Sequence, residues 1–206
     1  MAKLFAERLA RCITGLAFFG FGITLFIRAD LGLAPWDIFH QAVAEKLDIS
    51  IGLVIEGVGV LLLLLWIPLR QRPGIGTILN ALEIGFVVNL TKPWIGESDL
   101  LVVRILMIFA GLLSVAIGSA LYIGAGLGSG PRDGLMLGIS KLTVRGRRIS
   151  IRLARTSIEL SVLVAGLFLG GTIGVGTVAF MFGIGPLVQL ILPRFEMRLV
   201  NAPKVG

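Results

Sequence analysis

Six apolar segments, each about as long as a bilayer crossing, dominate this chain of 206 residues. They lie at about residues 10–28, 51–69, 75–91, 101–125, 150–170 and 174–193. About 20 apolar residues form a helix that crosses the hydrocarbon core and satisfies its own backbone hydrogen bonds. With 56% hydrophobic and 15% charged residues, the chain has too little polar surface for a water-soluble fold. We therefore predict one all-α polytopic membrane domain over residues 1–206.

The net charge of +7 comes from basic residues in short runs between the apolar segments. Such runs are typical of signals that orient membrane helices. We therefore expect the lipid bilayer, and no nucleic acid, as a partner. The basic stretch 1–11 leads directly into the first apolar segment without a small-residue cleavage site. It is therefore interpreted as part of a retained first helix, with the N-terminus in the cytoplasm.

Catalytic and metal-binding signatures are not found in the sequence. The single cysteine, Cys12, permits no disulfide within the chain, and the single histidine, His40, cannot form a metal site alone. No nucleophile elbow, HExxH sequence, phosphate-binding loop or nucleotide fingerprint is found. We expect no enzyme, no cofactor and no metal.

Two shorter segments, 35–47 and 131–143, each open with proline and hold 13 residues. As helices they are about 20 Å long at 1.5 Å per residue, which is too short to cross a bilayer comfortably. They follow glycine-containing turns that match one another. The run 29–37 is identical to the run 125–133 at five of nine positions, 96 residues apart.

A second block supports an internal repeat. Gly74-Ile-Gly-Thr77 matches Gly174-Val-Gly-Thr177, and Ile55-Glu56 falls beside Ile158-Glu159. We predict a first repeat over residues 9–92 and a second over residues 101–193. Each comprises a long helix, a turn, a short helix and two long helices.

The topology depends on whether the short helices cross the membrane. If they enter and return, the chain has six crossings plus two re-entrant helices, and the halves are inverted. If they cross, the chain has eight crossings in parallel halves. Lys and Arg counts do not decide between these arrangements. The polar content of 35–48, which includes Asp37, His40 and Glu45, favours the inverted arrangement.

The second turn is a candidate anion site. Gly128 and Gly130 permit tight backbone geometry, and Pro131 starts a helix whose first N–H groups are free. Arg132 adds a positive charge beside those amides, which favours an anionic solute or lipid head group. The alternative is purely structural, with glycines that allow close helix packing.

Four carboxylates lie in or near the apolar segments. Asp37 and Asp133 occupy the third position of their short helices, where a carboxylate caps free amides or holds an ion or a proton. Glu56 and Glu159 lie inside long apolar segments, where an ionised carboxylate must be paired or protonated. Arg155, four residues before Glu159, is its candidate partner.

The run Gly126-Leu-Gly-Ser-Gly-Pro-Arg-Asp-Gly-Leu135, the earlier Leu31-Gly-Leu-Ala-Pro-Trp-Asp37 and the run from Gly174 to Gln189 resemble the bacterial YczE/YyaS/YitT group of membrane proteins, and most closely its YczE branch. The resemblance covers nearly the whole chain. It implies a small multi-pass protein of the bacterial inner membrane and supplies no site residues.

Two functions compete. A small-solute transporter, with an anionic substrate and proton coupling, predicts that Asp37, Glu56, Arg132, Asp133 and Glu159 converge on one polar cavity. A membrane accessory or regulatory protein, which binds a partner or a lipid through the basic segment 141–152, predicts dispersed polar residues and no continuous cavity. We favour transport; the sequence does not define the oligomeric state.

Overall fold

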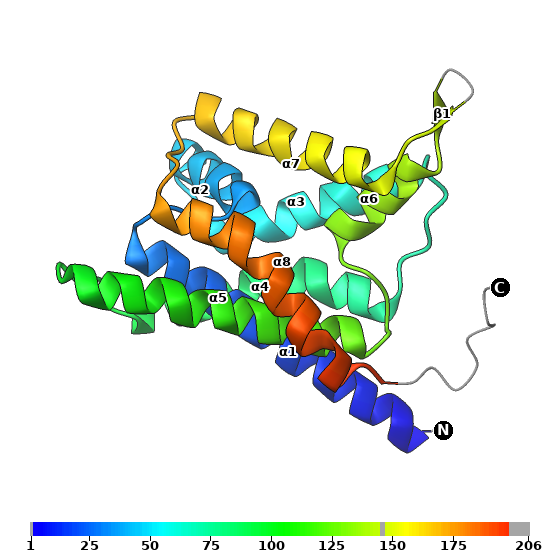
Figure 1. The fold of residues 1–206 in the computed structure, drawn as a ribbon, viewed down its shortest axis with the longest axis horizontal. Helices are drawn as coiled ribbons and strands as arrows, with labels where there is room; N and C mark the ends of the chain where they lie inside the picture. The colour runs from blue at the N-terminus through cyan, green and yellow to red at the C-terminus, as the bar shows by residue number, and fades with distance from the viewer. Residues whose placement is uncertain (1, 145–146, 198–206) are drawn as a thin grey trace.

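The computed structural model describes residues 2–144 and 147–197, and this part of the chain forms eight α-helices and one short 3-10 helix (Figure 1). The helices are α1 (Ala2–Ala29), α2 (Pro35–Leu47), α3 (Ile51–Trp66), α4 (Ile75–Thr91), the 3-10 helix η1 (Lys92–Trp94), α5 (Leu101–Gly124), α6 (Pro131–Ser140), α7 (Ile151–Phe168) and α8 (Val175–Phe195). Two-residue strands, β1 (Thr143–Val144) and β2 (Arg147–Arg148), pair antiparallel between α6 and α7.

The centre of the structure is the antiparallel pair α1 and α5, which lie side by side in Figure 1. Glycines let their backbones approach closely. A Cβ atom at Gly15 would lie 2.7 Å from the carbonyl oxygen of Gly118, and one at Gly22 would lie 2.7 Å from that of Gly111. Small residues at such a contact maximise van der Waals packing, which is the main attraction between helices in lipid.

Two further helices extend this pair into a row. α4 runs parallel to α1, and the Thr24 and Thr91 hydroxyl groups lie 2.7 Å apart near the ends of these two helices. α8 runs parallel to α5, and the backbone N–H of Met197, just after α8, donates to the carbonyl of Gly124 at the end of α5. α1 and α4 therefore run in one direction, and α5 and α8 run in the other.

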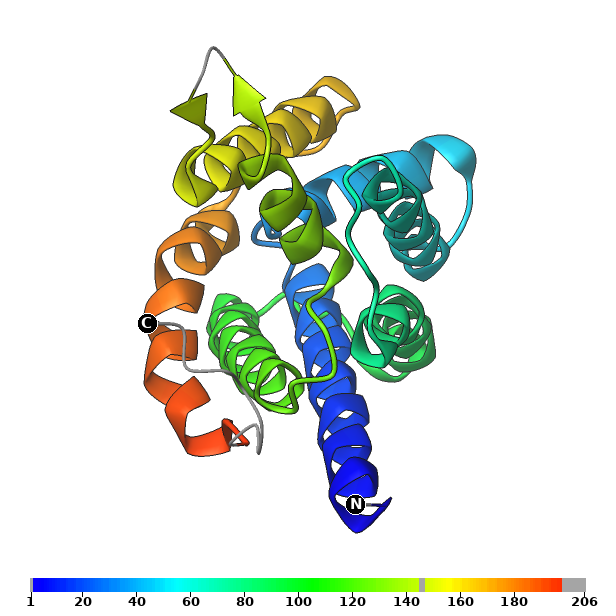
Figure 2. The same cartoon turned by 90° about the vertical axis from the view of Figure 1, so that its right-hand side faces the viewer.

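The remaining helices, α2, α3, α6 and α7, form a second layer over this row (Figures 1 and 2). α2 packs on α7, and α6 packs on α3. Gly134 of α6 lies directly against the Trp66 ring of α3, whose indole N–H donates to the carbonyl of Pro131 at 3.0 Å. Each short helix thus packs against a long helix from the other half of the chain.

The two glycine-containing turns each dock on the start of a helix from the other half of the chain. The Gly76 N–H donates to the Leu127 carbonyl at 3.0 Å, and the Gly176 N–H donates to the Leu31 carbonyl at 2.8 Å. Gly128 and Gly32 have φ values of +125° and +104°, a region that glycine enters without strain. These reciprocal hydrogen bonds fix where α2 and α6 begin.

Among the described residues, three helices are both long and apolar enough to cross a membrane: α1, α5 and α8. A fourth span results if α2 and α3, which are bent by 115° at a short break, count as one. α3 and α4 contain 16 and 17 residues, so they lie at the lower limit for a crossing. α7 has 18 residues but carries Arg152, Arg155 and Glu159. The membrane character is thereby supported, while six crossings stay a prediction.

The helix boundaries follow the sequence closely, with small differences. α2 covers 35–47 as predicted, whereas α6 ends at Ser140, three residues early, because the chain turns into the β1–β2 pair. α1 begins at Ala2, before its apolar segment, and the Glu7–Arg11 ion pair of 2.8 Å lies on this added part. Arg145 of the basic segment lies outside the described residues.

We predict that Gly128→Ala lowers the thermal stability of the purified protein more than Gly170→Ala does. Both glycines have positive φ values, which cost a side-chain-bearing residue about 1–2 kcal/mol. A Cβ at Gly128 would also lie 2.6 Å from Thr77 Oγ1, whereas one at Gly170 meets open space. Gly57→Ala, in an uncrowded helical position, is the control and should be neutral or stabilising. Equal losses at 128 and 170 would show that the docked turn tolerates a side chain.

Candidate functional site

A cavity of about 370 Å³ lies between the two layers, and both halves of the chain line it. Its size is typical of small-molecule sites, which range over roughly 300–1,000 Å³. The lining includes residues of α1, α4 and α5 below and of α6, α7 and α8 around it. Residues from both halves of the chain thus meet at one central cavity rather than only in scattered polar contacts.

The starts of both short helices face the cavity. Ala34, Pro35 and Trp36 come from the start of α2, and Gly130 and Arg132 come from the start of α6. The first N–H groups of a helix lack partners within it, and the aligned peptide dipoles place partial positive charge there. Two such ends on one cavity favour a solute with negative charge.

Arg132 connects the two starts. Its guanidinium carbon lies 4.8 Å from the centre of the Trp36 ring, a cation–π contact. Its Nη2 atom also lies 3.9 Å from Oδ1 of Asp37, which is buried beneath. The first residue after the proline in one turn therefore stacks on the equivalent residue of the other turn.

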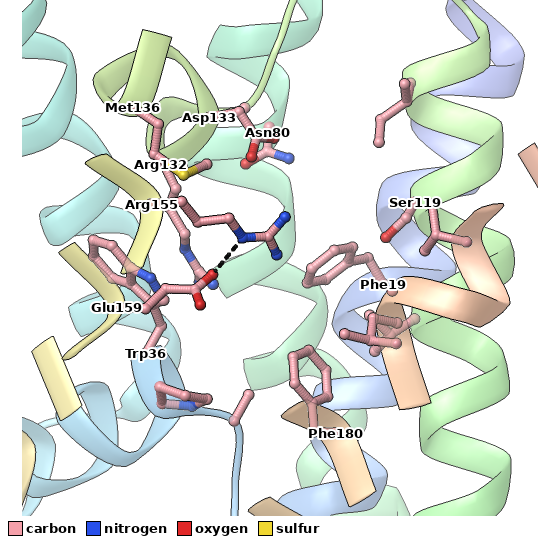
Figure 3. A pocket seen from close by; sticks show the side chains of 18 of the residues that line it. Phe19, Trp36, Asn80, Ser119, Arg132, Asp133, Met136, Arg155, Glu159 and Phe180 are labelled. Carbon is pink, nitrogen blue, oxygen red and sulfur yellow. Dashed lines mark hydrogen bonds and ion pairs between the residues drawn. The ribbon is translucent and has the colours of Figure 1, made fainter. Parts of the chain in front are cut away.

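Two further polar pairs line the same wall, and Figure 3 shows the first of them, Arg155 with Glu159. The Arg155 Nε atom donates to Oε1 of Glu159 at 2.9 Å, within α7. The Tyr122 hydroxyl, from α5, donates to Oδ2 of Asp133 at 3.1 Å. The wall thus carries two cations and two carboxylates, and each cation already lies near an acidic group.

The opposite wall carries most of the apolar lining, with Ser119 and Gln189 as its polar members. In Figure 3, Phe19 of α1 and Phe180 of α8 face the space across from Arg155 and Glu159. Ile184 and Val188 of α8 continue this apolar surface. An amphipathic small molecule, with a charged group toward Arg132 and an apolar part toward the phenylalanines, matches both walls.

Four of the seven predicted site residues line this cavity: Gly130, Arg132, Asp133 and Glu159. Asp37 approaches it indirectly, through Arg132. Gly128 lies behind the wall in the docked turn, and Glu56 lies elsewhere, packed against Gly85 between α3 and α4. The predicted pairing of Arg155 with Glu159 is confirmed.

Sequence reasoning missed several lining residues. Trp36 is one of them: its side chain is buried under Arg132 and only 7% exposed. The sequence alignment of the two turns places Trp36 at the position equivalent to Arg132, so it could have indicated that Trp36 belongs to the site. The sequence contains no comparable signal for Tyr122, Phe19 and Phe180, because an aromatic residue within an apolar helix looks the same in sequence whether it faces a cavity or lipid.

Within residues 2–144 and 147–197, no three His, Cys, Asp or Glu side chains gather as metal ligands would. The wall instead offers guanidinium groups, helix N-termini and carboxylates. This set is suited to binding and releasing a charged solute by hydrogen bonds and charge.

Residues 6–193 match the sequence profile of DUF6198, which is described as a family of unknown function. The chain belongs to this family. The resemblance to the YczE and YyaS proteins, drawn from the turn motifs, is likewise confirmed by the comparisons below.

Three family relatives align over nearly all of the chain. An uncharacterized protein of Haemophilus influenzae is 36% identical over 91% of this chain and 84% of its own length. The uncharacterized membrane protein YczE of Bacillus subtilis is 30% identical over 91% and 86%, respectively. YyaS of Bacillus subtilis, also described as uncharacterized, is 26% identical over 93% and 96%. No solved structure matches the chain significantly.

We predict strong energetic coupling between Tyr122 and Asp133. In a double-mutant cycle of Tyr122→Phe and Asp133→Ala, followed by unfolding of the purified protein, we expect a coupling free energy of about 1–3 kcal/mol, because the hydrogen bond joins a buried hydroxyl to a carboxylate acceptor. The matched cycle combines Arg155→Gln with Glu159→Gln, a more exposed pair on one helix. Here we expect a coupling free energy of about 0.3–0.5 kcal/mol. Additive effects at Tyr122 and Asp133 would contradict the assigned bond.

Proposed function

We propose that this chain is a secondary transporter for a small solute that carries an anionic group. The observation that carries the proposal is the cavity, where the starts of two short helices meet beside Arg132. Secondary transporters bind substrate near the middle of the membrane at the ends of such broken helices. The apolar wall of Phe19 and Phe180 suits a substrate with an apolar part.

The proposed architecture is a pair of inverted repeats with six crossings and two re-entrant short helices. α1 corresponds in sequence to α5, and α4 to α8, and the members of each pair run in opposite directions. Two hydrogen bonds, Gly76 to Leu127 and Gly176 to Leu31, join equivalent residues, and each runs from one half of the chain to the other. Both features are what a two-fold axis in the membrane plane produces.

One difference between the two halves lies beside the cavity, and it supports alternating access. α3 packs along α4, and a Cβ at Gly85 would overlap the Gly52 carbonyl of α3. The equivalent helices α7 and α8 stand apart, and a Cβ at the equivalent Gly185 meets nothing within 4 Å. Gly185 instead lines the cavity. We infer that the α7–α8 gap is open and the α3–α4 seam closed, and that the halves exchange these states during transport.

The alternative is a regulatory protein that binds a partner or lipid without transport. Such a protein needs no cavity shared by both halves, so the central cavity favours transport. In either case we propose that the protein lies in the bacterial inner membrane with its N-terminus in the cytoplasm, where the basic segment 141–152 meets anionic lipids. The start of α1 and Lys141 lie at the same end of the bundle, since α1 runs parallel to α4 and Lys141 donates to Gln71 just ahead of α4.

The test starts with a panel of small carboxylates, phosphates and sulfonates, screened for thermal stabilisation of the purified protein. We expect at least one anion to stabilise the wild type, and Arg132→Gln to bind it about 10–100-fold more weakly, because a charge-assisted hydrogen bond contributes about 1.5–3 kcal/mol. Arg72→Gln, an exposed arginine between α3 and α4, is the matched control and should bind normally.

The same anion must then accumulate in proteoliposomes that contain the wild type, and less so with Arg132→Gln. Binding without uptake would favour the regulatory alternative. Equal binding by Arg132→Gln and wild type would remove Arg132 from the site.

A further inference from the structure

His40 has an unusual environment. It is the single histidine of the chain, its side chain is 1% exposed, and it lies on α2 one turn after Asp37. Its Nδ1 atom lies 3.3 Å from Oδ1 of Asp37, while its Nε2 atom is buried without a hydrogen-bond partner in the described structure. A buried polar atom without a partner is unfavourable, so this one indicates a further ligand.

The Asp37 carboxylate determines which nitrogen is free. A carboxylate only accepts hydrogen bonds, so the Nδ1 atom of His40 carries the proton and donates it to Asp37. In the neutral imidazole, Nε2 is then an acceptor with an available lone pair. The group that completes this site must therefore donate a proton.

A second cavity lies beside His40. It measures about 20 Å³, enough for one water molecule, and His40, Asn80 and Arg132 are its polar lining residues. Asn80 and Arg132 also line the main cavity, so the two cavities share a wall. A water molecule can thus connect the main cavity to the buried imidazole.

The charged groups around His40 are few. Asp37 lies on its own helix and Arg132 comes from α6, and these are the charges whose fields reach the imidazole. α3 contributes Ile55, Val58, Gly59 and Leu62 to the small cavity, and α4 contributes the uncharged Asn80, Ala81 and Ile84. Where α7 packs on α2, Gly166 faces the backbone at Phe39.

Asp37 lies between the His40 imidazole and the Arg132 guanidinium. One oxygen, Oδ1, lies 3.3 Å from His40 Nδ1 and 3.9 Å from Arg132 Nη2. With neutral His40, the carboxylate offsets the charge of Arg132, and the three groups together carry no net charge. With protonated His40, the three carry one net positive charge at the wall of the main cavity.

We propose that proton binding at His40 and anion binding in the main cavity are coupled through Asp37. A solvent proton, relayed through cavity water as hydronium, adds to the Nε2 lone pair and leaves neutral water behind, and the Nδ1–H bond to Asp37 becomes an ion pair. Arg132 then shares less of the carboxylate and attracts the anion more strongly. Because linkage is reciprocal, the bound anion also favours the protonated imidazole. This inference rests on the proposed anion site and supplies its coupling ion.

The experiment measures binding of 2-phenylethanesulfonate, which keeps its charge across the pH range used, to protein in lipid nanodiscs. We expect wild-type affinity to be about 10-fold higher at pH 5.5 than at pH 8, within the usual range of 5–150-fold for coupled sites. His40→Gln should bind with pH-independent affinity. Glu45→Gln, a charge change on the exposed face of α2, is the matched control and should keep the wild-type dependence.

A second measurement follows the imidazole itself. Because the chain has one histidine, protein with ¹⁵N-labelled histidine gives a single pair of ring-nitrogen signals. We expect a neutral form protonated on Nδ1 that gains a proton on Nε2 as the pH falls. Ring signals that do not change between pH 4.5 and 8.5 would overturn the inference.

The outcomes separate this inference from the proposed function. Sulfonate binding that depends on Arg132 but is independent of pH, or pH-dependent in His40→Gln, would overturn the coupling and leave the anion site standing. No binding of this sulfonate or of any anion in the panel, at any pH, would overturn both.

Discussion

The reciprocal docking of the two glycine turns is the constraint on which the rest of the structure depends. Leu31 and Leu127 present their carbonyls to the N–H groups of Gly176 and Gly76, and positive φ values at Gly32 and Gly128 aim the chain there. A polar backbone in a membrane protein must find a partner, and each turn finds it in the other half. Each short helix therefore begins inside the protein beside the central cavity.

From this docking follows the chemistry of the cavity. Two helix N-termini concentrate positive potential at one place, and Arg132 adds a full charge stacked on Trp36. Asp37 lies beneath and within reach of both Arg132 and His40. One carboxylate thus connects a cavity sized for a small solute with a buried imidazole, which is the basis of the proposed coupling between anion and proton.

The sequence predicted the elements well because its strongest signals are local. Apolar length defined the long helices, and proline after a glycine turn defined the start of α2 and α6. It did not predict the open space at Gly185 or the tight contact at Gly85, because both depend on how far apart two helices stand. It grouped Glu56 with the site residues for the same reason, since equivalent positions in the two halves meet different neighbours.

We propose that the two halves are inverted around the cavity, and thiol labelling at two equivalent positions tests this arrangement. Lys46 and Lys141 are exposed residues at the ends of the two short helices. Each is replaced by cysteine in a protein with Cys12→Ala, and a membrane-impermeant reagent is applied to intact cells. We predict labelling at 46 and protection at 141. The same result at both positions would place the halves parallel and contradict the account.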